Sequence, residues 1–153
     1  MVYKKYRYVG YADEQYGKPL PQPAWAGILG PTIRAVVGDT IKVYFWNRTD
    51  RPLSIHPHGL LYDKDNEGAD GGKGAAVMPG ERYTYTWEVD RDAGPGPADP
   101  SSIVWLYHSH VMAEEEINLG LIGTIIITDR GKARSRGNPV PRDIDQEFVA
   151  LYM

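Results

Sequence analysis

Residues 103–110 read Ile-Val-Trp-Leu-Tyr-His-Ser-His, and this stretch carries both the fold and the candidate chemistry of the chain. Its β-branched and aromatic residues are typical of a strand, in which side chains two positions apart point to the same face. Val104, Leu106, His108 and His110 should therefore share one face. The two imidazoles at the end of that face would then be directed at one place.

A second pair of histidines with the same spacing occurs earlier, as His56-Pro57-His58. The sequence contains four histidines, and all of them fall into these two pairs. Pro57 cannot donate a ladder hydrogen bond, which places the first pair at a strand end or edge. Because neutral imidazole is a favoured ligand of copper, zinc, iron and nickel, His56, His58, His108 and His110 predict a metal site built from two strands.

Other parts of the chain also predict short strands separated by turns. Alternating or continuous apolar residues indicate strands at 2–9, 32–37, 40–47, 53–58, 82–89 and 119–128. Loops rich in Gly, Pro or Asp lie between them at 17–24, 63–80 and 90–101. Helical periodicity is almost absent, and the acidic run at 114–116 would open at most a short turn or helix. The pattern predicts an all-β sandwich or barrel.

Length and charge set limits on the organisation and the partners. A chain of 153 residues suits one domain with a real core, which we place at 1–128. A polar linker would follow at 129–144, and 145–153 would begin a following domain or form a contact strand between chains. The net charge of −3 gives no reason to expect nucleic-acid binding, and no apolar run approaches the roughly 18 residues of a membrane helix. No apolar leader is visible at the N-terminus.

Most of residues 20–128 resembles the first cupredoxin domain of multicopper oxidases. The likeness is to the ceruloplasmin and hephaestin group, to which the A domains of coagulation factors are related. The stretches that carry it, in order, are WAGILGP at 25–31 with GD at 38–39, HPHG at 56–59, NEGA at 66–69, PGE at 79–81 with YTY at 83–85, YHSH at 107–110 and LGLIG at 119–123. Two HxH motifs in this order and setting are specific evidence for the family, whereas the PGE or GD turn alone would be weak evidence.

This resemblance implies a cupredoxin-like Greek-key β-sandwich that supplies half of a trinuclear copper cluster between two cupredoxin domains. By resemblance, His56 would bind the type 2 copper, His58 and His108 one type 3 copper, and His110 the other. The assembly would reduce dioxygen (O2) to water with electrons from a cysteine-bearing partner domain or chain. The isolated chain would be inactive as an oxidase. The family also implies a secreted or periplasmic location. Its cupredoxin domains are arranged around a threefold or pseudo-threefold axis, so we expect a homo-oligomer, with a homotrimer favoured.

The sequence departs from a complete oxidase at Ser109. In domains that carry type 1 copper, this position between the two histidines holds a cysteine. The chain contains no cysteine, and type 1 copper requires a thiolate, so we expect no type 1 copper in it. The calcium-binding loop of the group is shortened here to residues 70–74, so calcium binding is not carried over.

Two other interpretations remain open. The chain could be a structural, A-domain-like interaction module that kept the fold and lost the metal, although such a member would be expected to lose some of the four histidines. It could also hold a mononuclear zinc, iron or copper site, although the glutamate that follows HxH in cupin sites is missing. Glu114, Glu115 and Glu116 could steer cations or relay protons, but a solvated acidic loop is the simpler interpretation. The reducing substrate is not determined.

Overall fold

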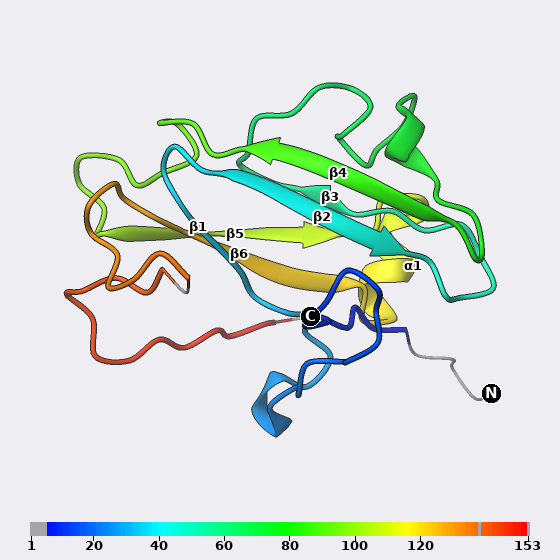
Figure 1. Ribbon diagram of the computed structural model, residues 1–153, viewed down its shortest axis with the longest axis horizontal. Helices are drawn as coiled ribbons and strands as arrows, with labels where there is room; N and C mark the ends of the chain where they lie inside the picture. The colour runs from blue at the N-terminus through cyan, green and yellow to red at the C-terminus, as the bar shows by residue number, and fades with distance from the viewer. Residues whose placement is uncertain (1–5, 138, 153) are drawn as a thin grey trace.

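Two packed β-sheets form the body of the protein in the computed structural model, which describes residues 6–137 and 139–152 (Figure 1). Within those residues one sheet has the strand order β1-β6-β5-β3, and the other pairs β2 with β4. The strands are β1 (Ile33–Val36), β2 (Thr40–Trp46), β3 (His56–Pro57), β4 (Arg82–Glu88), β5 (Ser102–His108) and β6 (Ile122–Thr128). The predicted all-β sandwich is confirmed.

The strand register brings distant parts of the chain together. β1 runs parallel to β6, with Ile33 opposite Ile125, and β5 runs antiparallel to both β6 and β3. Between β5 and β6 the chain makes one short helix, α1 (Ala113–Asn118), which follows the second histidine pair. Short 3-10 turns occur at Ala24–Ala26 and Lys73–Ala75. The two histidine pairs therefore meet where β3 and β5 end, at the same end of the sandwich as α1.

The core lies between the two sheets and follows from strand alternation. β4 directs Tyr85 and Trp87 inward, and β6 directs Ile125 and Ile127 inward, and all four side chains are fully buried. Large aromatic side chains bury much apolar area each, and the tyrosine hydroxyl and indole N–H then need polar partners. Tyr85 donates to the Gly74 carbonyl at 2.7 Å. The core thus also anchors the long loop between β3 and β4.

Two strand predictions require correction. Residues 1–5 of the predicted strand 2–9 lie outside the described residues, and residues 6–9 form no strand. Tyr6 and Tyr8 are buried instead, and the Tyr8 hydroxyl donates to the Ser54 carbonyl at 2.6 Å, so this segment packs side chains into the core without joining a sheet. The predicted strand 53–58 is reduced to His56–Pro57, because Leu53 pairs with Val77 in an isolated bridge.

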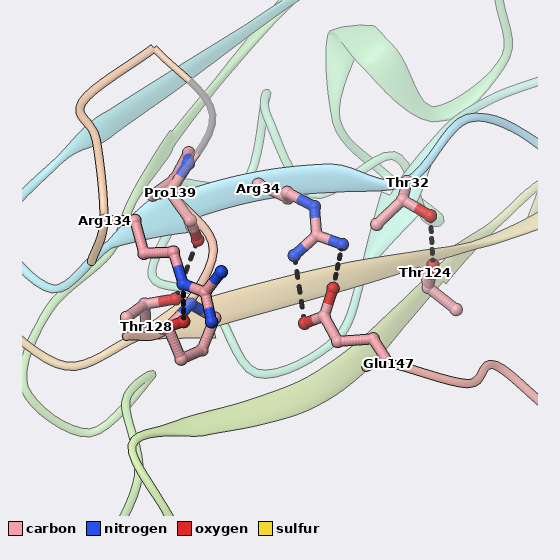
Figure 2. A network of polar contacts seen from close by, with 8 residues as sticks. Thr32, Arg34, Thr124, Thr128, Arg134, Pro139 and Glu147 are labelled. Atoms are coloured by element: carbon pink, nitrogen blue, oxygen red, sulfur yellow. Dashed lines mark hydrogen bonds and ion pairs between the residues drawn. The ribbon is translucent and has the colours of Figure 1, made fainter. Parts of the chain in front are cut away.

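The C-terminal segment packs across the first sheet, as Figure 2 shows. Arg34 of β1 forms a two-pronged ion pair with Glu147, and the Thr128 hydroxyl donates to the Pro139 carbonyl at 2.9 Å. Residues 145–152 form no strand here, and Phe148 and Tyr152 are 87% and 92% exposed. The assignment of this segment to a following domain or to another chain stays a prediction.

We expect Ile127→Ala to lower the free energy of unfolding by about 2–5 kcal/mol, because it leaves a cavity in the rigid centre of the core. The matched control is Val104→Ala on the neighbouring strand, where the side chain is 59% exposed and the loss should stay below about 1 kcal/mol. Urea denaturation of both variants measures the difference. Equal losses would contradict this location of the core.

Candidate metal centre

The four histidines are positioned by the end of the β3–β5 ladder. His56 lies directly opposite His108, and Pro57 lies opposite Tyr107. The ladder is continued by His58, whose N–H donates to the Leu106 carbonyl at 2.9 Å. Directly opposed residues of antiparallel strands have neighbouring side chains. The register therefore brings the two pairs together at one end of the first sheet.

The imidazole rings form a compact cluster. Ligand nitrogens of His56, His58 and His108 all lie within 4.8 Å of one another, and the Nε2 atoms of His58 and His108 are 3.0 Å apart. His110 lies beside this trio, with its ring centroid 5.0 Å from that of His56 and 5.6 Å from that of His108. The structure thus brings all four predicted residues into contact distance, with His110 on one side of the group.

Hydrogen bonds orient two of the rings with Nε2 available. His56 Nδ1 lies 2.7 Å from the Glu67 carbonyl, and His108 Nδ1 lies 2.8 Å from the Ser109 carbonyl. A carbonyl oxygen can only accept a hydrogen bond, so each Nδ1 carries the hydrogen and each Nε2 keeps its lone pair for an ion. The Nε2 atoms of His58 and His108 are in hydrogen-bond contact at 3.0 Å, so the two rings direct Nε2 to the same place, where an ion would take the place of the shared hydrogen.

His110 differs from the other histidines in its polar contacts. Its Nδ1 is buried and has no hydrogen-bond partner among the described residues. A buried polar atom without a partner costs free energy unless something else satisfies it. An imidazole cluster that holds a ring nitrogen in this state fits a metal site better than a purely structural group of histidines.

Burial also keeps the imidazoles neutral. It lowers the pKa of His56, His58 and His108 below the ordinary histidine value, because the charged form loses hydration. At His58 the neighbouring His108 lowers the pKa further, since two imidazolium ions would repel each other. Neutral rings are the form that binds a metal ion, so the site is ready for one near neutral pH.

The loop between β3 and β4 supplies the carbonyl that orients His56. Gly68 adopts φ +70°, and a Cβ there would lie 2.1 Å from the Ile55 carbonyl oxygen, so glycine allows the loop to approach the strand. Asn66 ties the loop to β4 by accepting the Thr86 N–H at 2.8 Å and the Trp87 indole N–H at 2.9 Å. Nothing in the spacing of this loop indicated that the carbonyl of Glu67 would face a histidine.

The acidic run beside the site is divided between surface and interior. Glu114 and Glu115 are exposed, and Glu115 accepts a hydrogen bond from Arg51 at 2.5 Å. Glu116 is 1% exposed, with its Oε2 unpaired among the described residues. The interpretation of a fully solvated acidic loop is therefore wrong at Glu116, which α1 turns toward the interior.

The donor set limits the chemistry of the site. Four imidazoles without a thiolate suit copper, zinc, iron or nickel, and exclude a cysteine-ligated blue copper site within this chain. His58 is exposed, whereas His108 is 6% exposed, so the cluster is open on one side. An ion held here would keep coordination positions for further ligands.

Comparison with known proteins places this geometry in a family. The sequence profile described as multicopper oxidase matches residues 26–132. The chain is 42% identical to mouse ferroxidase HEPHL1, 41% to human hephaestin and 36% to human ceruloplasmin, each over 99% of its length. It spans 14%, 14% and 15% of those proteins. The crystal structure of a multi-copper oxidase from Pseudomonas thermotolerans matches with a TM-score of 0.57 and 25% identity, over 70% of this chain and 24% of that chain.

We expect the metal-free protein to lose stability as the pH falls from about 7 to about 5.5. Unfolded histidines bind protons near pH 6.5, and burial lowers the pKa of folded His56, His58 and His108 below that value. In that window the unfolded state holds more protons, so the free energy of unfolding must fall with pH. His58→Gln should flatten the dependence, measured by urea denaturation of both proteins. Identical slopes would show that the cluster does not contribute.

Proposed function

The chain belongs to the multicopper oxidase family, and on this premise we propose that its four histidines form half of a type 2 and type 3 copper cluster. It is a cupredoxin-like β-sandwich of the ceruloplasmin and hephaestin type, and copper is the cofactor of the family. The single observation that best supports the proposal is the 3.0 Å separation of the His58 and His108 Nε2 atoms, beside His56. A second cupredoxin domain would supply the remaining ligands.

The proposed division of ligands is the one that the resemblance to multicopper oxidases implies, and the arrangement of the rings is compatible with it. His58 and His108 form the tightest nitrogen pair and would share one type 3 copper. His110 stands outside the trio of His56, His58 and His108 and would serve the other type 3 copper, while His56 would serve the type 2 copper. The carbonyls of Glu67 and Ser109 support this role, because they hold two of the rings with Nε2 free.

Bound copper would supply the redox chemistry by which the assembled enzyme reduces dioxygen to water. This chain's own residues lower the pKa of His56, His58 and His108 by burial. They also fix the tautomers of His56 and His108 and shield His108 from solvent. The absence of cysteine means that electrons must come from another domain or chain, where a thiolate-ligated copper would receive them. We propose ferrous iron as the first substrate to test, because one relative is named a ferroxidase.

The open side of the cluster is where we place the partner domain. His58 lines a groove of about 790 Å³ that continues along the outer face of β5 and β6 to the C-terminal segment. Val104 and Leu106 on this face are 59% and 37% exposed. Exposed apolar residues beside an incomplete ligand set suit coverage by another cupredoxin domain. Among the described residues no helix is long and apolar enough to cross a membrane. The likeness to hephaestin and ceruloplasmin is the basis on which we propose a secreted or periplasmic location.

One alternative has a specific observation in its favour. The trio of His56, His58 and His108 would be enough to hold a single ion, as in a mononuclear zinc, iron or copper site. A structural module without metal has less support, because it would have no use for a cluster whose His110 Nδ1 is left unpaired. Metal stoichiometry separates these possibilities.

Copper titration of the full chain tests the proposal. We expect nitrogen-ligated Cu(II) by electron paramagnetic resonance, no intense blue thiolate band, and stabilisation of about 2.7 kcal/mol at a free copper concentration of 100 times Kd. His108→Ala should weaken copper binding at least about tenfold and leave the fold intact, because the residue ends a strand. The exposed Lys42→Ala is the control. An intense blue band, or unchanged binding in His108→Ala, would refute the proposal.

Assembly gives a second test. Phe148 and Tyr152 expose apolar surface, and the copper half-site is open, so we propose that the chain self-associates as a homotrimer when no partner domain is present. Light scattering at micromolar concentration should give about three times the 17.1 kDa chain mass. Phe148→Ser combined with Tyr152→Ser should shift the population toward monomer. A wild-type mass of one chain would contradict the prediction.

A further inference from the structure

Two buried serines lie directly behind the histidine cluster. Ser54 lies two residues before His56, the first histidine of the first pair, and Ser109 lies between the two histidines of the second pair. Both are 0% exposed. Buried hydroxyls are normally hydrogen-bonded, so each must be accounted for by a specific partner.

The serines bond reciprocally across the two segments. The Ser54 N–H donates to the Ser109 Oγ at 3.0 Å, and the His110 N–H donates to the Ser54 Oγ at 3.0 Å. The Tyr8 hydroxyl donates to the Ser54 carbonyl at 2.6 Å and so anchors the same residue from the core. Each serine therefore satisfies a backbone N–H of the opposite segment, and we call the pair the serine clamp.

The hydrogen bonds of the serine clamp take the place of ladder hydrogen bonds just beyond the end of the β3–β5 pairing. β5 ends at His108, and the next N–H, that of Ser109, turns toward β6 and donates to the Leu121 carbonyl at 3.2 Å. The His110 N–H is thus paired with the Ser54 hydroxyl instead of a strand carbonyl. Its ring gains no protein hydrogen bond at Nδ1 among the described residues. The position of the His110 side chain therefore depends mainly on its backbone hydrogen bond, whereas the rings of His56 and His108 are also held by hydrogen bonds of their own.

We propose that Ser54 and Ser109 are positioning residues that hold His110 against the other three histidines. This inference rests on the proposed copper-binding function and adds to it a cause for the placement of the fourth ligand. Removing the Ser54 hydroxyl would leave the His110 N–H buried without its acceptor, and the segment would move to find another one. The trio of His56, His58 and His108 would keep its own hydrogen bonds.

The decisive experiment compares Ser54→Ala with Thr128→Ala in the full chain. Thr128 is also 0% exposed, and its hydroxyl makes one buried bond, to the Pro139 carbonyl (Figure 2). It ends β6, whereas His108 is paired with Ile122 at the start of that strand. Both changes remove a buried hydroxyl and should lower the melting temperature to a similar extent. Copper affinity is then measured by competition with a chelator, and the copper environment by electron paramagnetic resonance.

We expect Ser54→Ala to weaken copper binding at least about tenfold and to change the resonance spectrum, with Ser54→Thr restoring both. Thr128→Ala should bind copper as the wild type does. If Ser54→Ala is folded and binds copper like the wild type, the clamp has no positioning role and the proposal fails. If the wild type itself binds no copper, the proposed function fails instead, so the two failures are distinguishable.

Hydrogen exchange of the wild-type protein tests the clamp even where a variant does not fold. The His110 amide should exchange slowly, at a rate close to that of the ladder-bonded His58 amide. Ser109→Ala, which removes the acceptor of the Ser54 N–H, should accelerate exchange at both Ser54 and His110. Fast exchange at His110 in the wild type would overturn the proposal.

Discussion

The pairing of His56 with His108 across β3 and β5 is the interaction on which the site depends. β3 is two residues long, and one of them is a proline that cannot donate to the ladder. Such a short strand cannot hold its register by ladder hydrogen bonds alone. The register is maintained by contacts outside the ladder. These are the Leu53–Val77 bridge and the two bonds of the serine clamp, from Ser54 N–H to Ser109 Oγ and from His110 N–H to Ser54 Oγ. A shift of one residue would turn the imidazoles to the opposite face.

Two buried polar groups near the histidine cluster lower the stability of the fold. The His110 Nδ1 and the Glu116 Oε2 are buried and unpaired among the described residues, and a sequence optimised for stability would avoid both. By contrast, the carbonyls of Glu67 and Ser109 fix the tautomers of His56 and His108 at 2.7 and 2.8 Å. The ring nitrogens of His56 and His108 that face the backbone are thus satisfied, whereas the Nδ1 of His110 is not.

The proposed half-site agrees with the fact that the chain spans 14–15% of the length of its relatives. Its open side is continuous with the exposed apolar residues of β5, and Phe148 and Tyr152 extend the apolar surface in the C-terminal segment. A cupredoxin sandwich is stable through its own core, in which Tyr85, Trp87, Ile125 and Ile127 are fully buried. This core does not involve the histidine cluster, so the proposed copper site can be open on one side without exposing the centre of the sandwich.

The sequence by itself determined the features that depend on local period. The alternation in TIKVYFWN predicted a strand at 40–47, and the observed strand covers Thr40–Trp46. The HxH spacing predicted two rings on one face in each pair, and the lack of cysteine excluded a thiolate-ligated copper here. These properties need no knowledge of distant contacts. The ligand assignment itself stays a prediction.

Only the tertiary structure decided the features set by residues far apart in the chain. In the folded protein Glu116 is buried, and the Glu67 carbonyl lies against His56. Tyr6 and Tyr8 belong to no β-strand. The tertiary structure also brought Ser54 against Ser109, whose separation in the sequence carries no periodic signal. The physical reason is that the two-residue period of a strand sets the face to which a side chain points. The residue that this side chain then contacts depends on how the whole sandwich packs.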